Sequence, residues 1–258
     1  LCWARKTTER FKAHYPKGFE PTIYPEALPS PLHLKKPARI GVCFMGDLFG
    51  DWVDPEQVVE IPDRISNQPG APFRLRETIW TVMKGSPQHT FIFLTKSWNL
   101  KAWSPFPKNA WVGRTAWDEQ AVSQSLYAPG GLKNIVAGRK WLSLEPLLRR
   151  MWLDPRDFEW CGISWLVIGA LTGTKKDMEA AHKKWPGLEL MPSPDRNQWT
   201  LQPPVEWVRE IVEAADKAGA KVWLKNNLTP GLAPLGGGLF PKWARRAGPY
   251  LRQALPGE

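Results

Sequence analysis

The residues best suited to chemistry follow short apolar runs of the chain. The first run, from Arg39 to Gly46, ends at a small residue and is followed by the carboxylate of Asp47. A buried parallel strand of this kind delivers a polar group to the ligand-binding edge of an α/β sheet. Later runs end in the same way, and their polar residues are Thr95, Lys96, Glu145 and Lys225. We take these side chains as candidates for one site.

The runs that carry these residues predict the strands of a parallel sheet. Their bounds are 39–46, 90–96, 110–115, 140–146, 165–169 and 221–226. Helical spacing is clearest at 204–219, where Pro204 begins and Gly219 ends the predicted helix, and further helices are predicted over 3–14 and 73–84. Alternating strands and helices predict a parallel sheet, open or closed into a barrel, with the site at the C-terminal ends of its strands.

The length and the proline distribution predict one domain with insertions. The chain has 258 residues, and an α/β barrel of this size is commonly a single domain. We expect this domain over residues 1–228, followed by a Gly/Pro-rich basic tail over 229–258. Dense prolines over 15–37 exclude a helix interior or a central strand, so this stretch is a connecting loop. A short helix is predicted to begin at Pro55, with Asp54 as its N-cap.

The chain is basic, with 35 Lys and Arg residues against 25 Asp and Glu and a pI near 9.6. This excess favours an anionic partner such as nucleic acid, bound through its phosphates by residues that include Arg245, Arg246 and Arg252. A solvated basic surface without a partner is the alternative. No apolar run approaches the ~18 residues of a membrane span, and no signal segment opens the chain. We therefore expect a cytoplasmic protein with no membrane partner.

Motifs of several enzyme classes are missing from the sequence. It contains no G-x-S-x-G, P-loop, G-x-G-x-x-G or H-E-x-x-H, so hydrolase, NTPase, dinucleotide and His-based metal sites lack their signatures. The run Gly236–Gly238 has no strand before it and is interpreted as a flexible turn. His89 precedes a predicted strand, at the edge opposite the expected site, and is interpreted as structural.

The three cysteines lie far apart and form no C-x-x-C pair, which argues against a disulfide or zinc framework. Cys43 and Cys161 are predicted to be small core residues. Cys2 stands next to Trp3 near the start of the chain, where no core is evident. Since the chain opens with Leu1 and not with Met, we expect a fragment.

The sixteen tryptophans have two interpretations. Aromatic rings stack on bases in proteins that bind single-stranded nucleic acid. Five tryptophans lie on predicted strands or on the predicted helix, and these are expected in the core: Trp111, Trp141, Trp165, Trp207 and Trp223. Trp98, Trp103 and Trp117 follow strand ends, from which they could reach the site.

Six segments, in order, resemble the motif series of a phage and bacterial family of unknown function that is related to radical SAM proteins, domain-of-unknown-function family 5131. The segments are Cys2–Ala4, Leu34–Ile40, Met45–Phe49, Pro87–Phe91, Leu94–Lys96 and Leu142–Leu147. In that family a cysteine-rich loop ends in Cys-aromatic-Ala, and Cys2 resembles its last cysteine. The resemblance implies that the earlier cysteines and the first strand precede Leu1.

What the resemblance implies is a partial (β/α) TIM-like barrel of the radical SAM type, with proline-rich insertions. Three cysteines, Cys2 among them, would hold a [4Fe–4S] cluster, and S-adenosylmethionine would chelate its fourth iron. Met45, Gly46 and Asp47 would meet the methionine amino group. Four further residues would line the same mouth: Thr95, Lys96, Glu145 and Lys225. A flavodoxin or ferredoxin would be the reductant.

Two features leave alternatives open. Where the family carries a Gly-Gly-Glu-Ser-Gly-like run, residues 169–173 are Gly-Ala-Leu-Thr-Gly and lack the acid. The Asp47 carboxylate could instead cap the following helix. The leading hypothesis is a radical SAM-type enzyme acting on an unknown substrate, such as nucleic acid or a modified base. The alternatives are a phage-associated, non-catalytic barrel that binds nucleic acid, and a metal-independent enzyme with Asp47 and Glu145 as acid and base.

Overall fold

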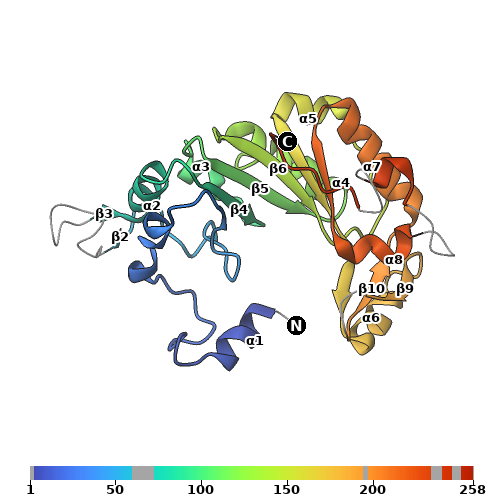
Figure 1. Ribbon diagram of the computed structural model, residues 1–258, viewed down its shortest axis with the longest axis horizontal. Helices are drawn as coiled ribbons and strands as arrows, with labels where there is room; N and C mark the ends of the chain where they lie inside the picture. Colours follow the sequence, from blue (N-terminus) through green and yellow to red (C-terminus); the bar gives the residue numbers. More distant parts are fainter. Residues whose placement is uncertain (1–2, 60–72, 194–196, 234–239, 246–250, 258) are drawn as a thin grey trace. The chain divides into compact units, whose positions relative to one another are not determined.

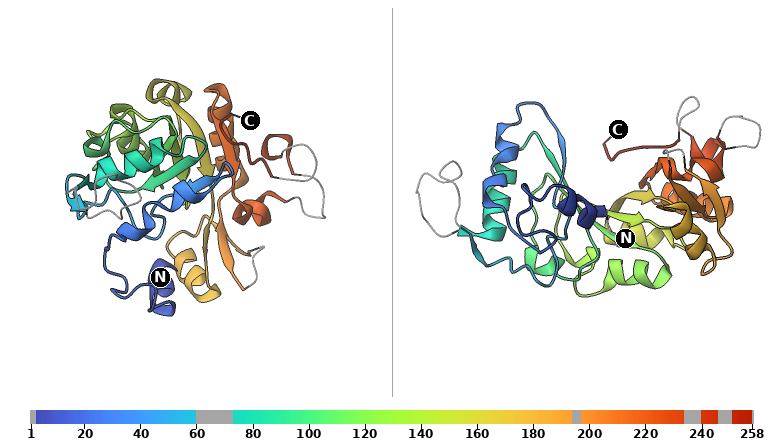
Figure 2. Two further views of the ribbon diagram at one scale, coloured as in Figure 1. Left: turned by 60° about the vertical axis from the view of Figure 1, so that its left-hand side comes forward. Right: turned by 90° about the horizontal axis from the view of Figure 1, so that it is seen from below.

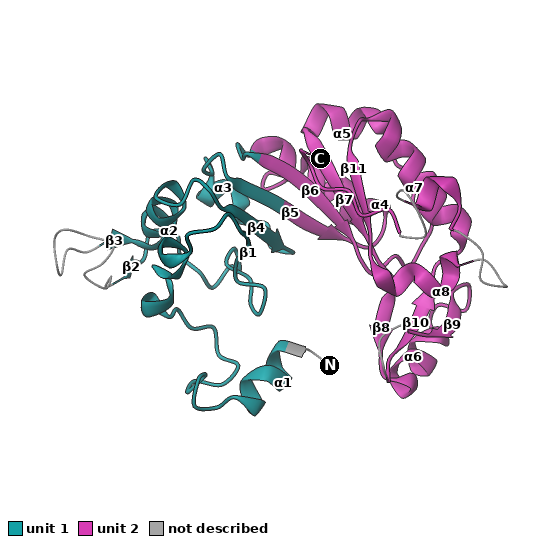
Figure 3. Cartoon of the chain, in the orientation of Figure 1, with its two compact units in different colours: residues 1–112, 135–138 teal, residues 113–134, 139–258 magenta. Residues whose placement is uncertain are grey.

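The computed structural model describes residues 3–59, 73–193, 197–233, 240–245 and 251–257. The chain divides into two compact units, shown in two colours in Figure 3. Unit 1 comprises residues 1–112 and 135–138, and unit 2 comprises 113–134 and 139–258. The single barrel domain with a separate tail, expected from the sequence, stays a prediction.

The principal sheet has six strands, which Figure 1 draws as arrows. In sheet order they are β1 (Arg39–Gly41), β4 (Thr90–Thr95), β5 (Ala110–Ala116), β6 (Arg139–Leu144), β7 (Ile163–Ile168) and β11 (Lys221–Leu224). The order along the sheet follows the order along the chain, as in a (β/α) barrel and unlike a doubly wound sheet. The pairs β1–β4, β6–β7 and β7–β11 are parallel. The fold is therefore α/β, a partial (β/α) barrel of parallel strands, as predicted.

Unit 1 packs around aromatic rings. Its other elements are α1 (Trp3–Arg10), the 3-10 turns Pro25–Ala27 and Ser30–His33, the antiparallel pair β2 (Val58–Val59) and β3 (Phe73–Arg74), α2 (Leu75–Lys84) and α3 (Leu100–Trp103). Helix α2 confirms the predicted apolar face, since Leu75, Ile79 and Met83 are buried. The ring of Phe49 lies 5.6 Å from that of Phe93 and 5.4 Å from that of Trp103, between centroids. These buried rings anchor the loop after β1 against β4.

Unit 2 contains α4 (Glu119–Tyr127), α5 (Pro155–Cys161), α6 (Lys175–His182), α7 (Val205–Lys217), α8 (Thr229–Leu232) and the 3-10 turns Leu132–Asn134, Asn226–Leu228 and Lys242–Ala244. The side chains of Asp118, Asp154 and Thr174 cap α4, α5 and α6 by accepting backbone N–H bonds. Helix α7 confirms the clearest sequence prediction. It packs against β11, and α5 packs against both α7 and β7, on one side of these strands (Figure 1).

A second, antiparallel sheet interrupts the barrel pattern after β7. Its strands lie in the order β8 (Leu171–Gly173), β10 (Trp199–Gln202) and β9 (Glu189–Pro192), with α6 beside them (Figure 2). Met178, Leu188 and Leu201 form its buried core. The sequence indicated only a polar excursion over 175–202, because alternating short strands with few apolar residues give a weak periodic signal.

The C-terminal segment returns to β11 as an antiparallel edge. The Leu224 N–H donates to Arg252 O over 2.8 Å, and the Ala254 N–H donates to Val222 O over 2.9 Å. Arg252 also forms an ion pair with Asp216 of α7. This segment therefore covers the last strand of the sheet. The predicted turn at Gly236–Gly238 and Arg246 lie outside the described residues.

Three local predictions are wrong. Strand β1 ends at Gly41 and not at Gly46, because Cys43 adopts a φ of +55° that a strand cannot continue. Cys43 is accordingly exposed in a turn and is not a core residue. The expected helix at Pro55 is a turn, since the Arg76 N–H takes the Pro55 carbonyl that a helix would use.

Two other predictions are confirmed. Cys161 is buried in unit 2. His89 is buried and has a structural role: its Nδ1 accepts the Ala38 N–H at 3.1 Å, which leaves Nε2 to donate to Pro31 O at 3.1 Å. No helix within the described ranges has the length and apolar character needed to cross a membrane.

Candidate functional site

In unit 1, the Asp47 carboxylate joins the loop after β1 to the end of β4. The buried Thr95 hydroxyl lies 2.7 Å from each Asp47 oxygen and donates to the carboxylate. The backbone N–H groups of Lys96 and Phe49 donate to it at 3.1 Å each. A carboxylate has about four acceptor positions, so most of the capacity of Asp47 is already used by the protein. Asp47 caps a turn, through the N–H two residues on, and not a helix.

Met45 and Gly46 complete the turn that precedes Asp47. The Gly46 N–H donates to Cys43 O at 3.0 Å, and the Tyr15 hydroxyl contacts Met45 Sδ at 3.4 Å. The turn is therefore held by the N-terminal segment on one side and by Thr95 on the other.

In unit 2, Glu145 and Lys225 form an ion pair at the carboxyl ends of β6 and β11. Lys225 Nζ lies 2.7 Å from Glu145 Oε1 and 2.9 Å from Oε2, and the side chains of Lys225 and Glu145 are 42% and 25% exposed. The pair lies where parallel strands deliver polar groups. A partly exposed pair of this kind contributes little to stability.

Asn227 fixes the backbone beside this ion pair. Its Nδ2 donates to Ala170 O at 2.9 Å and to Thr172 Oγ1 at 3.1 Å, and its Oδ1 accepts the Ala170 N–H at 3.2 Å. The side chain also approaches Glu145 Oε1 at 3.4 Å. These bonds tie the ends of β6, β7 and β11 together.

A pocket of about 580 Å³ opens at these strand ends within unit 2. Its lining comprises Glu145, Pro146, Ala170, Leu171, Thr172, Gln198, Trp223, Lys225, Asn226, Asn227 and Gln253. The volume lies within the range of small-molecule sites, about 300–1,000 Å³. Gln253 comes from the C-terminal segment and donates to Leu224 O at 3.0 Å and to Asn226 Oδ1 at 2.8 Å. The C-terminal segment therefore supplies one wall of the pocket.

Three tryptophan rings contact one another on neighbouring strands, and one of them lines the pocket. The Trp141 and Trp165 centroids are 4.8 Å apart, and Trp165 and Trp223 are 6.4 Å apart. Trp141 and Trp165 are buried, whereas Trp223 lines the pocket and is half-buried. The expectation of core tryptophans is confirmed for the first two. Trp223 offers an aromatic ring to a ligand.

A protein-family model matches most of this chain. The family described as "Protein of unknown function (DUF5131)" has a model that matches residues 1–187. The chain belongs to this family. No curated protein matched the sequence.

Two solved structures have some similarity to this DUF5131 protein. One is "Spore photoproduct lyase complexed with dinucleoside spore photoproduct", at 10% identity and a TM-score of 0.43. The other is a cysteine-to-alanine mutant of spore photoproduct lyase with the same dinucleoside photoproduct, at 12% identity and a TM-score of 0.44. Each alignment covers 87% of this chain and 72% of the other chain.

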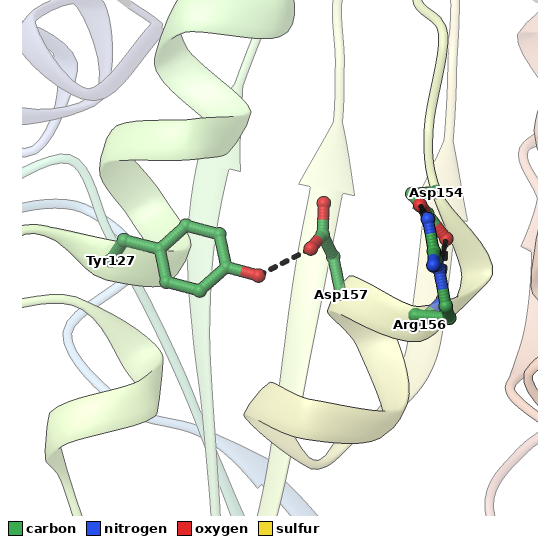
Figure 4. Close-up of polar contacts among 4 residues, drawn as sticks. All are labelled: Tyr127, Asp154, Arg156 and Asp157. Carbon is green, nitrogen blue, oxygen red and sulfur yellow. Dashed lines mark hydrogen bonds and ion pairs between the residues drawn. The ribbon is translucent and has the colours of Figure 1, made fainter.

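A smaller pocket of about 210 Å³ lies between α4 and α5 of this DUF5131 protein. The Tyr127 hydroxyl donates to Asp157, and Arg156 forms an ion pair with Asp154 (Figure 4). The pKa of Tyr127 is raised, first by desolvation and then by the bond to Asp157, while Arg156 lowers the pKa of Asp154 to about 2. Both carboxylates already have protein partners, which favours a structural role for them.

The predicted site residues fall into two groups in this DUF5131 protein. Thr95 and Lys96 contact Asp47 in unit 1, and Lys225 contacts Glu145 in unit 2. That all of them converge on one site stays a prediction. Sequence reasoning missed Asn227 and Gln253. The adjacent amides Asn226 and Asn227, at the end of the predicted 221–226 strand, were the available signal for Asn227. No local sequence pattern indicated Gln253.

A cysteine-held cluster has no ligand set in the described part of the chain. Three cysteine thiolates are needed for a [4Fe–4S] cluster with one open iron. No group of three His, Cys, Asp or Glu side chains suited to a metal occurs among the described residues. Cys43 and Cys161 belong to different units, and Cys2 lies outside the described residues. The described residues therefore do not fit the cluster, and its ligation by Cys2 stays a prediction.

Proposed function

We propose that this chain is the barrel of a radical SAM-type protein and that the 580 Å³ pocket of unit 2 binds S-adenosylmethionine. The observation that carries the proposal is the Glu145–Lys225 ion pair at the mouth of a pocket lined by amides and one indole. The lining offers a negative charge, a positive charge, amides that can hydrogen-bond to the edge of a base, and an aromatic ring that can stack on the base. S-adenosylmethionine has a group complementary to each of these.

Four residues of the pocket, Glu145, Lys225, Asn226 and Trp223, each suit a group of that ligand. The Glu145 carboxylate suits the ammonium and sulfonium charges, and Lys225 suits the carboxylate. The amide of Asn226 has the donor and acceptor that an adenine edge requires, and the Trp223 ring can stack on the base. Bound S-adenosylmethionine supplies a sulfonium centre that radical SAM proteins cleave. Residues of this chain bind and orient it, and shield it from water.

The residues of unit 1 enter the proposal through the resemblance alone. As the alternative to Glu145, the resemblance assigns the methionine amino group to Met45, Gly46 and Asp47, whose carboxylate has one acceptor position left. Thr95 and Lys96 hold that carboxylate in place through the contacts described above.

Binding of S-adenosylmethionine, measured by equilibrium dialysis, tests the proposal. Glu145→Gln should weaken binding about tenfold, because a cation loses its counter-charge and about 1.4 kcal/mol corresponds to that factor. Lys225→Met should have a similar effect. S-adenosylhomocysteine lacks the sulfonium charge, so Glu145→Gln should weaken its binding less.

The matched control is Glu210→Gln, which removes a carboxylate from the Arg150–Glu210 ion pair elsewhere in unit 2. This variant should bind S-adenosylmethionine as the parent chain does. Equal losses in Glu145→Gln and Glu210→Gln would show that net charge, and not the pocket, governs binding. Absence of binding by the parent chain contradicts the proposal outright.

A further inference from the structure

The N-terminal segment of unit 1, residues 3–19, carries a concentration of unpaired positive charge. Its Lys and Arg residues are Arg5, Lys6, Arg10, Lys12 and Lys17, and its single acid is Glu9. All five basic residues are exposed, and none of them forms an ion pair with a described residue. Uncompensated cations on one short segment make a local anion-binding surface.

Cations of unit 2 contrast with this segment. Arg150, Arg156 and Arg252 each form an ion pair with a carboxylate. Arg252 was a predicted phosphate ligand, but Asp216 already occupies its guanidinium. Arg252 is thus already paired, whereas the five N-terminal cations form no ion pair with a described residue.

Two exposed aromatic rings lie among these cations. Phe11 and Phe19 are 50% and 42% exposed. The Arg10 guanidinium lies 5.2 Å from the Phe11 centroid, and that of Arg5 lies 4.8 Å from the Phe19 centroid. Rings that stack on bases beside cations that neutralise phosphates are the two parts of a single-strand binding surface.

The segment has turns of its own backbone and one side-chain contact to the turn before Asp47. The Phe11 N–H donates to Thr7 O, and the Gly18 N–H donates to Tyr15 O, so turns extend α1 as far as Gly18. The Tyr15 hydroxyl contacts Met45 Sδ, which fastens the segment to the turn before Asp47. A strand bound here would pass beside that turn.

We propose that residues 3–19 bind single-stranded nucleic acid, with Arg5, Lys6, Arg10, Lys12 and Lys17 on phosphates and with Phe11 and Phe19 stacked on bases. An anionic membrane is the other partner that a basic helix could take. Helix α1 lacks the wide apolar face that insertion into a bilayer needs, since six of its eight residues are polar or charged. This proposal does not depend on the proposed S-adenosylmethionine site.

Fluorescence anisotropy with a labelled single-stranded oligonucleotide, over about 50 to 200 mM salt, tests the proposal. Five phosphate contacts should give a slope of log Kd against log salt of about 3.5. Arg10→Gln combined with Lys12→Gln should lower that slope by about 1.4, because two contacts are lost. Phe11→Leu combined with Phe19→Leu should weaken binding about tenfold and leave the slope unchanged.

The matched control is Lys183→Gln with Lys184→Gln, which removes two exposed cations from unit 2. Its slope should stay within error of that of the parent chain. An equal fall in both double variants would overturn the proposal in favour of diffuse charge attraction. A matched duplex bound as tightly as the single strand, or no effect of the two Phe substitutions, would refute the stacking role. Tighter binding to vesicles of anionic phospholipid than to the oligonucleotide would make the segment a membrane surface.

Discussion

Asp47 in unit 1 and Glu145 in unit 2 are both carboxylates that follow strands of the parallel sheet, yet their surroundings differ. Asp47 accepts hydrogen bonds from Thr95, from Lys96 and from Phe49, and two of these donors are backbone N–H groups. Glu145 pairs with the partly exposed Lys225 side chain beside an open pocket. The first carboxylate fixes a loop, and the second faces a space that a ligand can fill.

This difference shows that position at a strand end does not by itself make a carboxylate functional. Backbone donors cannot move away from Asp47, so a ligand must use what acceptor capacity remains. A lysine ammonium on a flexible stem can exchange Glu145 for a ligand group at little cost. The polar network around Glu145 is therefore the better starting point for experiments on function.

Asp47→Ala should have the largest effect on stability. The buried Thr95 hydroxyl and two backbone N–H groups lose their acceptor, which should lower the free energy of unfolding by about 3 kcal/mol. Urea denaturation measures this change. A loss below about 0.5 kcal/mol would mean that Asp47 does not fix the loop.

Gly169→Ala should displace the Glu145 carboxylate without removing it. An added Cβ would lie 2.7 Å from Glu145 Oε1 and 2.9 Å from its Cδ, so the Glu145 side chain must shift from the position in which it pairs with Lys225. We expect about tenfold weaker binding of S-adenosylmethionine, which corresponds to about 1.4 kcal/mol. Gly187→Ala is the control, since a Cβ there meets no atom within 4 Å. Unchanged binding in Gly169→Ala would remove Glu145 from the site.

Gln253→Ala should loosen the pocket wall that the C-terminal segment provides. It removes the hydrogen bonds to Leu224 O and Asn226 Oδ1, which together should cost about 1 kcal/mol of stability. Hydrogen exchange at the Leu224 amide, which donates to Arg252 O, should become faster. An unchanged exchange rate would mean that the segment stays on β11 without Gln253.

Tyr127→Phe should have the smallest effect: it removes the hydrogen bond to Asp157 at every pH, and the part of its effect that changes with pH should appear in alkali. The folded-state pKa of Tyr127 is raised, so the unfolded chain loses its phenolic proton first as the pH rises above about 10. The unfolding free energy of the parent chain should therefore fall across that range, and the variant should lack this part of the decline. Thermal melts of both proteins between about pH 8 and 11 measure the difference. Parallel melting curves would contradict the raised pKa.

Much of the fold was predictable from local pattern. Apolar runs predicted all six parallel strands, and Pro204 and Gly219 marked the ends of α7 to within a residue or two. The prediction was wrong at Cys43, where a left-handed residue ends β1 early, and at Pro55, where a distant amide takes the carbonyl. In both places the deciding contact or conformation leaves no periodic signal.

The sequence by itself determined the elements, their order and the polar residues that follow each strand, because hydrophobic period and turn residues act over a few positions. Only the tertiary structure decided the partners. Thr95 reaches Asp47 across 48 positions of the chain, and Lys225 reaches Glu145 across 80. Which atoms meet over such separations depends on strand register and packing, and from these contacts follow the clamp at Asp47 and the open ion pair at Glu145.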